Sequence, residues 1–423
     1  MRPRFDPVGT AARRAALRVL DAVLRRGQPI EAGLARAGEG LSPADRGLAH
    51  AIAAETLRWL ADLDTLIDGA TRQRLPDDAK ARFALRIALV QALRLGTPPH
   101  AAIATALPLV DGGPRKLVHG VFGALMRGGA ALPDLPSLPP EVAARWLAAH
   151  GQAMVDAARA AIAAPPPVDL TLADPGTTAE WVERLGGISL MPGHVRLPAG
   201  ADVPALPGFA EGAWWVQDLA ATIAVRLMGA GAGTALDLCA APGGKTMQLA
   251  AAGWSVTAVD IAEQRLIRLR ENLSRTGLSA ELVAADVTRW RPDAPADAVL
   301  IDAPCSATGI FRRHPDVLHR AHPRLIDETA ALQATILSRA ADWVRPGGQL
   351  VYAVCSLEPV EGEGQLATFL SARDDFVVEP ITGDQLPAGV TPRDDGKLRT
   401  LPTMLADSGR LDGFFIARLR RRP

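Results

Sequence analysis

The second half of the chain alternates short apolar runs with longer amphipathic stretches. The runs have the length of strands, whereas the stretches between them space apolar residues three and four positions apart, as an α-helix does. In the stretch 262–276, for example, Leu266, Leu269 and Leu273 fall on one helical face. Alternation of this kind predicts an α/β fold, doubly wound around a parallel sheet. The predicted strands are 234–239, 255–260, 281–286, 297–302, 348–355, 376–380 and 413–419.

Residues 11–128 have a helical pattern throughout. Ala16, Leu20 and Leu24 lie on one face of a first helix, and arginines occupy much of the remainder. A second helix has a clear start, because Ser42 can cap it and Pro43 suits the first helical position. We predict a compact helical domain whose arginine-rich first helix is either a phosphate-binding surface or a solvated face. The arginines are Arg13, Arg14, Arg18, Arg25 and Arg26.

A linker and a segment of mixed pattern join these two parts. Residues 128–140 are rich in glycine and proline, which predicts a domain boundary. One alanine-rich helix is predicted from about 141 to 164. Trp214 and Trp215 could stack on a base, but adjacent tryptophans are more often buried in a core. The predicted domains are residues 1–130, 131–229 and 230–423.

The composition is that of a folded protein. Of 423 residues, 48% are hydrophobic and 22% charged, which argues against extended disorder. The formal net charge is zero, so nucleic acid would have to be bound by local patches. Residues 1–6 contain no apolar segment, and the longest charge-free run, 95–110, falls short of the roughly 18 residues of a membrane span. We expect a cytoplasmic protein without a secretory segment or membrane contact.

The chain contains three cysteines, Cys239, Cys305 and Cys355. They are too few and too widely spaced for a disulfide framework or a zinc site of the CxxC kind. A free buried thiol is the simplest interpretation of each cysteine taken singly. We expect no metal site.

The stretch 234–250 breaks an apolar strand at a Pro-Gly-Gly turn and continues as a helix. Gly243 and Gly244 allow the backbone to approach a ligand closely, and the N–H groups that open the next helix favour accepting or anionic atoms. Asp260 ends the following strand about 20 residues further on, where such folds bind ribose hydroxyls. The stretch therefore predicts a nucleotide-cofactor site.

Three cofactor classes compete for this site. A P-loop would need glycine at the position of Cys239, and a dinucleotide site would need G-x-G-x-x-G, so the sequence disfavours both. An S-adenosylmethionine site remains, with Asp260 for the ribose and Asp286 near the adenine.

Five consecutive predicted strands end in acids or thiols. These ends are 239–245, Asp260, Asp286, 302–305 and Cys355. Because the carboxyl ends of parallel strands meet at one edge of a sheet, we expect a single shared site. Each residue also has a simpler interpretation: Asp260 and Asp286 could cap the following helices, and Cys239 and Cys355 could be small core residues.

The motifs of the second half together resemble those of the RNA cytosine-C5 methyltransferases. They are LDLCAAPGGKT at 236–246, DAPCSATGIFRRHPD at 302–316, LVYAVCSL at 350–357 and DGFFIAR at 412–418. Residues 13–20, 93–103 and 116–127 resemble the NusB-like RNA-binding domain, which usually has Asn where this chain has His119. The resemblance implies a Rossmann-like seven-stranded methyltransferase domain, preceded by an all-α NusB-like domain and a small α+β RNA-binding lobe.

The resemblance also implies a reaction and its residues. Cys355 would add to C6 of cytosine, Asp302 would hydrogen-bond the ring near N3, and Cys305 would help to remove the C5 proton and expel Cys355. S-adenosylmethionine would be the cofactor, and small-subunit (16S) ribosomal RNA the substrate of a monomeric enzyme. Arg312, Arg313 and His314 would contact RNA. The cofactor would be bound by Cys239, Ala240, Ala241, Pro242, Gly243, Gly244, Lys245, Asp260, Asp286 and Asp302.

The sequence departs from the family pattern in places and leaves an alternative open. Val354 stands where the family usually has Thr, and Thr171 and Ala173 replace residues that are more polar. A catalytically silent RNA-binding or assembly factor could retain the same fold, although the presence of both Cys305 and Cys355 disfavours it. Methylation of an exocyclic amine would require an Asn/Asp-Pro-Pro-aromatic loop, which 302–305 lacks.

Overall fold

The computed structural model describes residues 6–423, which form two compact units. The first unit contains residues 6–145, 162–164 and 313–320, and the second contains 146–161, 165–312 and 321–423. The expectation about residues 1–6 falls, apart from Asp6, outside the described range. The domain boundaries at 130 and 229 stay predictions.

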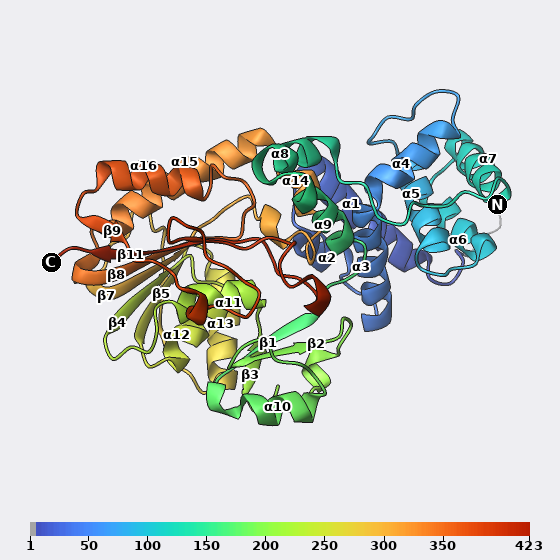
Figure 1. Ribbon diagram of the computed structural model, residues 1–423. Helices are drawn as coiled ribbons and strands as arrows, with labels where there is room; N and C mark the ends of the chain where they lie inside the picture. The colour runs from blue at the N-terminus through green and yellow to red at the C-terminus, as the bar shows by residue number, and fades with distance from the viewer. Residues whose placement is uncertain (1–5) are drawn as a thin grey trace. The chain divides into compact units, whose positions relative to one another are not determined.

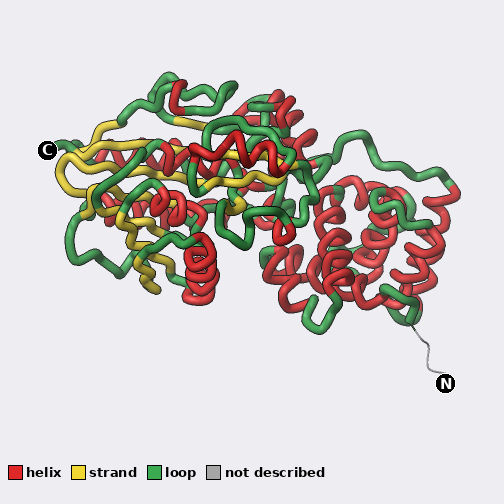
Figure 2. The backbone as a smooth tube through the Cα atoms, turned by 90° about the horizontal axis from the view of Figure 1, so that it is seen from below, coloured by secondary structure: helices red, strands yellow, loops and turns green. Residues whose placement is uncertain are grey.

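The first unit is helical, as the sequence predicts, and Figure 2 shows it built of helices and loops. Helix α3 starts as expected: the Ser42 hydroxyl accepts a hydrogen bond from the Asp45 N–H at 3.1 Å, and Pro43 follows the cap. The helices are α1 (Thr10–Arg26), α2 (Ile30–Ala37), α3 (Pro43–Arg58), α4 (Leu60–Gly69), α5 (Lys80–Leu93), α6 (Pro99–Ala106), α7 (Gly113–Arg127) and α14 (Val317–Arg320).

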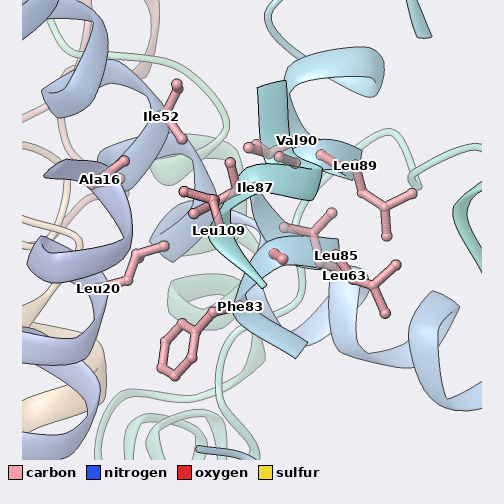
Figure 3. Close-up of a cluster of buried hydrophobic side chains, with 14 of the residues drawn as sticks. Ala16, Leu20, Ile52, Leu63, Phe83, Leu85, Ile87, Leu89, Val90 and Leu109 are labelled. Atoms are coloured by element: carbon pink, nitrogen blue, oxygen red, sulfur yellow. The ribbon is translucent and has the colours of Figure 1, made fainter. Parts of the chain in front are cut away.

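An apolar core holds the helices of this unit together (Figure 3). Leu20 of α1, Ile52 of α3 and Leu85 of α5 are completely buried in it. Truncating one buried leucine to alanine typically costs about 2–5 kcal/mol. The core therefore fixes the orientation of α1 and with it the position of its exposed arginines.

The alanine-rich segment after the linker forms two helices. These are α8 (Pro140–His150) and α9 (Gln152–Ile162), separated by Gly151, whose φ of 80° is left-handed and ends α8. The prediction of a single helix over 141–164 is wrong. The alanine-rich sequence on both sides of Gly151 favours helix, so composition alone does not show that the helix ends there.

A small α+β lobe belongs to the second unit. Its antiparallel sheet has the order β2-β1-β3, formed by β1 (Val168–Leu172), β2 (His194–Leu197) and β3 (Trp214–Val216), and helix α10 (Thr178–Leu185) accompanies it. Trp214 and Trp215 are almost completely buried, and their indole N–H groups donate to the Pro207 carbonyl and to Gln217. The expectation that both are core residues is confirmed.

The main sheet has the order β10-β11-β8-β7-β4-β5-β6, with β9 paired to β11. Strands β4 to β8 pair in parallel, whereas β11 is antiparallel to β8, β9 and β10. The seven predicted strands are present, and β10 is an eighth that is too short to leave an alternating pattern. The strands are β4 (Thr234–Leu238), β5 (Ser255–Asp260), β6 (Glu281–Ala284), β7 (Ala296–Asp302), β8 (Val344–Val354), β9 (Phe376–Val378), β10 (Leu398–Arg399) and β11 (Phe415–Arg421).

Helices cover both faces of this sheet (Figure 1). Helices α11 (Leu219–Arg226), α12 (Gly244–Ala251) and α13 (Glu263–Thr276) pack on one face, and α15 (Pro323–Ala341) and α16 (Glu363–Ala372) on the other. Within residues 6–423 no helix is long and apolar enough to cross a membrane. The same residues contain no group of three or more His, Cys, Asp or Glu side chains that could hold a metal ion.

The strand order reverses beside β4. Leu238 at the end of β4 pairs with Ile301 of β7, and Asp302 at the end of β7 pairs with Ala353 of β8. The carboxyl ends of these three strands are therefore neighbours, which is where open α/β sheets bind their ligands.

Candidate active site

The loop between β4 and α12 forms the predicted cradle. Cys239 and Gly243 have left-handed backbone conformations, with φ of 62° and 104°. A Cβ atom at Gly243 would overlap the side chain of Leu269 in α13, so only glycine fits there. The predicted cofactor residues 239–245 make up this loop and the first residues of α12, whose leading N–H groups have no partner within the helix.

Asp260 supports the cradle from the end of β5. Its carboxylate accepts hydrogen bonds from the Ala241 N–H at 3.0 Å and the Ala262 N–H at 2.9 Å, and its residue is only 2% exposed. Each carboxylate oxygen can accept more than one hydrogen bond, so the predicted ribose contact is compatible with these two. Asp260 thus ties the cradle to the chain that leads into α13.

Asp237 lies in β4 beneath the cradle and is completely buried. One of its carboxylate oxygens accepts a hydrogen bond from the Thr246 hydroxyl at 2.5 Å, while the other, Oδ1, has no partner among the described residues. Burial raises the pKa of Asp237 to about 7. A buried acceptor without a donor, beside a loop that admits only glycine, fits the ammonium group at the amino-acid end of S-adenosylmethionine.

Lys245 joins the cradle to the end of β7. Its Nζ atom lies 2.7 Å from Oδ2 of Asp302 and 5.4 Å from the ring centre of Phe414. Burial alone would lower the pKa of Lys245, but the Asp302 carboxylate raises it above its ordinary value. The ion pair thereby joins the predicted cofactor cradle to Asp302, the predicted cytosine-binding residue.

Asp286 lies after β6 and is partly exposed. Its carboxylate accepts hydrogen bonds from the hydroxyl and the N–H of Thr288, at 2.7 and 2.8 Å, and these bonds lower its pKa. The local turn thus occupies Oδ1 of Asp286. The other oxygen, Oδ2, lies 3.9 Å from Nε of the exposed Arg289 and is the oxygen left for the predicted adenine contact.

The structure brings two of the three cysteines into contact. Cys305 follows β7, Cys355 follows β8, and their Sγ atoms are 3.4 Å apart. The hydrogen bond with Cys355, together with burial, raises the pKa of Cys305 well above its ordinary value. The third cysteine, Cys239, lies in the cradle, and burial raises the pKa of its thiol to about 12, so little of it is thiolate at neutral pH.

Two hydrogen bonds hold the segments of the two cysteines together. The Gly309 N–H donates to the Cys355 carbonyl at 2.9 Å, and the Leu357 N–H donates to the Thr308 hydroxyl at 3.0 Å. Val354, where the family usually has Thr, is completely buried in the apolar core of the sheet, an environment that suits valine. The departure at this position therefore leaves the thiol in place.

Arg312 is an internal residue of the second unit. Its guanidinium is 2% exposed and donates to Asp218 at 3.0 Å, to Asp412 at 3.1 Å and to the Gly409 carbonyl at 2.7 Å. These bonds connect the start of α11 to the chain before β11. The burial of Arg312 removes it from the surface that a phosphate could reach, so we assign it a structural role instead of the expected RNA contact.

Arg313 and His314 belong to the first unit and are half-buried. His314 Nδ1 lies 2.7 Å from a carboxylate oxygen of Glu31 in α2. In the same short segment, His319 hydrogen-bonds the Leu57 carbonyl of α3 at 2.8 Å. The segment 313–320 thus packs with the helical unit, and its predicted RNA contacts stay predictions.

The arginines of α1 divide into two kinds. Arg13 is buried and donates to Gln91 of α5 at 2.7 Å, so it supports the fold. Arg25 and Arg26 are exposed and pair with Asp21, while Arg18 is also exposed. A hollow of about 430 Å³ lies beside them. Its charged lining residues are Arg18, Asp21, Arg25, Arg26, Arg36, Asp78 and Lys80.

Known families match both parts of the chain. The family described as 16S rRNA methyltransferase RsmB/F matches residues 225–420, and the NusB family matches residues 10–127. The ribosomal RNA small subunit methyltransferase B of Klebsiella pneumoniae (strain 342) is 34% identical over 440 residues, covering 96% of this chain and 97% of the relative. The protein of the same name from Xanthomonas campestris pv. campestris is 35% identical over 400 residues, covering 88% and 90%.

The chain belongs to the ribosomal RNA small subunit methyltransferase B family. Membership confirms the predicted methyltransferase class and S-adenosylmethionine as the cofactor, which the cradle and the Asp237 oxygen fit. It also confirms the NusB-like nature of the helical unit.

Solved structures agree with the fold of this family. The crystal structure of PH0851 has a TM-score of 0.76 at 22% identity and covers 97% of this chain and 99% of its own. NSun6 from Pyrococcus horikoshii with SFG has a TM-score of 0.58 at 18% identity and covers 67% and 98%. At these identities the likeness concerns the fold alone.

Two buried acids beside the candidate site, Asp237 and Glu361, were missed by the sequence prediction; Glu361 binds Ser306 and Ser356, which follow the two cysteines. In the sequence, Asp237 is an acidic residue within an apolar strand pattern. An acid at a position that should be buried is itself a sign of a special role, and it could have identified Asp237. Glu361 is one of three glutamates in the stretch 358–363, and nothing in that pattern distinguishes it from Glu358 and Glu363.

Proposed function

We propose that the protein transfers a methyl group to C5 of a cytosine in RNA, through a covalent bond between Cys355 and C6 of the ring. The observation that carries this proposal is the contact of Cys305 and Cys355 at 3.4 Å, beside the ion pair of Lys245 and Asp302. The names of the relatives, which are ribosomal RNA methyltransferases of the small subunit, support 16S ribosomal RNA as the substrate.

The chemistry explains why a nucleophilic thiol is needed. C5 of cytosine is a weak nucleophile, and addition of a thiolate at C6 turns C5 into an enamine-like carbon that can accept a methyl group. S-adenosylmethionine supplies that methyl group when it is bound. C5 must then lose its proton to a base, after which the bond between C6 and sulfur breaks and the thiolate is restored.

The two thiols would divide these steps between them. Cys355 forms and breaks the bond to C6. Cys305 takes the C5 proton as a thiolate, and its raised pKa makes that thiolate a strong base. Asp302, held by Lys245, would bind the ring near N3, and Asp260 and Asp286 would bind the ribose and the adenine of the cofactor.

The proposal is tested by the product and by the covalent intermediate. Small-subunit RNA from a strain lacking the protein is incubated with enzyme and S-adenosylmethionine, digested to nucleosides and examined by mass spectrometry. We expect 5-methylcytidine with the wild-type enzyme and none with Cys355→Ala. Methylation at another atom, or equal 5-methylcytidine with Cys355→Ala, would refute the assignment.

A second assay uses RNA with 5-fluorocytidine in place of cytidine. Fluorine cannot leave C5 as a proton does, so the adduct should persist and migrate as protein joined to RNA in a denaturing gel. Absence of such a complex with an enzyme that still makes 5-methylcytidine would exclude the covalent route.

A further inference from the structure

Glu361 carries a completely buried carboxylate that is surrounded by neutral donors. It lies just before α16. One oxygen accepts hydrogen bonds from the Ser306 N–H at 2.8 Å, the Thr329 hydroxyl at 2.6 Å and the Gln333 side-chain amide at 3.2 Å. The other accepts from the hydroxyls of Ser306 and Ser356, each at 2.5 Å. No Lys or Arg of the described residues pairs with it.

The position of these donors connects Glu361 to both thiols. Ser306 directly follows Cys305, and Ser356 directly follows Cys355. One carboxylate therefore binds the neighbour of each cysteine, and the two Sγ atoms lie 3.4 Å apart. The backbone of Glu361 is fixed as well, because its carbonyl accepts the Tyr352 hydroxyl at 2.6 Å.

A purely structural role explains this arrangement poorly. Burying a carboxylate among neutral donors costs desolvation free energy that an apolar side chain of similar size would avoid. The charge has a local effect, because Glu361 is one of the groups that raise the pKa of Cys305. It thus disfavours the thiolate at Cys305.

We propose that Glu361 is a positioning residue that holds the thiols of Cys305 and Cys355 in contact by binding Ser306 and Ser356, and that its negative charge disfavours a second negative charge at Cys305. The inference rests on the proposed function for its meaning in catalysis. Its geometric part concerns the free protein and can be tested without any substrate.

Two variants separate geometry from charge. In Glu361→Gln the amide oxygen can face the Ser306 N–H, Thr329 and Gln333, while the NH₂ group faces two hydroxyls that can turn to accept. This variant keeps the arrangement and removes the charge. Glu361→Ala removes both. Ser356→Ala keeps Glu361 and removes one of its hydrogen bonds, together with the bond that the Ser356 hydroxyl accepts from the Glu358 N–H, and it serves in case Glu361→Ala fails to fold. Asp375→Asn, which weakens an ion pair with Arg373 before β9, is the matched control for loss of a carboxylate elsewhere.

The first measurement is the rate at which diamide, a two-electron oxidant of thiols, joins Cys305 to Cys355 in the full-length protein. Alkylation followed by peptide mass spectrometry identifies the disulfide. We expect a fast reaction for the wild type and Asp375→Asn, and a reaction at least as fast for Glu361→Gln, because its Cys305 ionises more readily. The rate for Glu361→Ala should be about tenfold or more below that of Glu361→Gln, with an intermediate rate for Ser356→Ala. Equal rates for all folded variants would overturn the positioning role.

The second measurement is the pH dependence of iodoacetamide alkylation at Cys305. Removal of the charge in Glu361→Gln should move its midpoint to lower pH, whereas Asp375→Asn should leave it unchanged. An unchanged midpoint in Glu361→Gln would overturn the role of the charge.

Methylation assays then distinguish the failure of this inference from that of the proposed function. If wild-type protein makes no 5-methylcytidine, the proposed function fails while the oxidation and alkylation results still decide the role of Glu361. If the wild type is active and Glu361→Ala retains its full turnover rate, the positioning role in catalysis is refuted and the proposed function stands.

Discussion

Lys245 and Asp302 form an ion pair of 2.7 Å that connects the first turn of α12 to the end of β7. Because α12 begins at the cofactor cradle and Asp302 precedes the loop with Cys305, the pair couples the two halves of the site. The raised pKa of Lys245, caused by Asp302 against the effect of burial, keeps its ammonium charged at neutral pH.

Replacement of Lys245 by Met keeps the length of the side chain and removes its charge. Since one charge-assisted hydrogen bond is typically worth about 1.5–3 kcal/mol, methyl transfer should slow roughly 10- to 100-fold. Single-turnover kinetics with labelled S-adenosylmethionine measure this rate directly. A Lys245→Met enzyme with the wild-type rate would show that the pair is only structural.

Asp237 should lower the free energy of unfolding of the protein while it strengthens cofactor binding. Its pKa is raised by burial to about 7, above the ordinary value near 3.8, so the folded state loses stability as the pH rises from about 4 to about 7. Asp237→Asn cannot ionise and should be more stable than the wild type by about 1–4 kcal/mol at pH 8, with a smaller difference at pH 5.

Urea unfolding of both proteins at the two pH values checks this expectation, and calorimetric titration of the variant should show weaker S-adenosylmethionine binding. A variant that is less stable than the wild type at pH 8 would contradict the assignment of the raised pKa.

Asp260 should matter for S-adenosylmethionine binding. Asp260→Ala removes the proposed ribose contact and the acceptor of the Ala241 N–H, so affinity should fall about tenfold or more. Calorimetric titration measures the change, with Asp156→Ala on the exposed side of α9 as a control. Unchanged affinity in a folded Asp260→Ala protein would exclude the role.

The exposed arginines of α1 should contribute to RNA binding, whereas the buried Arg13 should contribute to stability. Combined replacement of Arg18 and Arg25 by Ala removes exposed charges and should weaken RNA binding, with a flatter dependence on salt. Arg13→Ala should instead lower the unfolding free energy, because Gln91 loses its buried partner. Equal RNA affinity and equal salt slope in the double variant would identify the face as merely solvated.

The contrast between these arginines shows that the sequence pattern does not predict which polar residues of a helix are buried by contacts with other elements. Helical spacing places Arg13 on the polar side of α1, yet the residue packs against α5, a contact that no local pattern encodes. The expected RNA contact of Arg312 is a second example, because its side chain is buried between Asp218 and Asp412, which lie about a hundred residues away on either side.

The thiols and acids at the strand ends could be predicted together because parallel strands bring their carboxyl ends to one edge. Cys305 and Cys355, fifty residues apart in the chain, are in contact for this reason. Glu361 could not be found in this way, since its role depends on donors from three segments and two other glutamates, Glu358 and Glu363, lie close to it in the sequence.

Cys305 and Cys355 lie in contact with each other, yet the replacement of one should prevent the covalent adduct and the replacement of the other should make it accumulate. Cys355→Ala lacks the sulfur that bonds C6, so neither adduct nor 5-methylcytidine should form. Cys305→Ala should still attack and transfer the methyl group, then stall, because no base takes the C5 proton. Protein joined to RNA should accumulate, survive denaturing electrophoresis and disappear with ribonuclease.

The stall should depend on S-adenosylmethionine and on pH. Without the methyl donor the addition at C6 is reversible, so the stalled adduct should appear only when S-adenosylmethionine and a target cytosine are both present. In the wild-type enzyme the release step should accelerate as the pH rises, because the raised pKa of Cys305 leaves little thiolate at neutral pH. In Cys305→Ala that acceleration should be lost. Accumulation of adduct in Cys355→Ala instead would reverse the two roles, and full methylation by both variants would mean that neither thiol acts as a nucleophile.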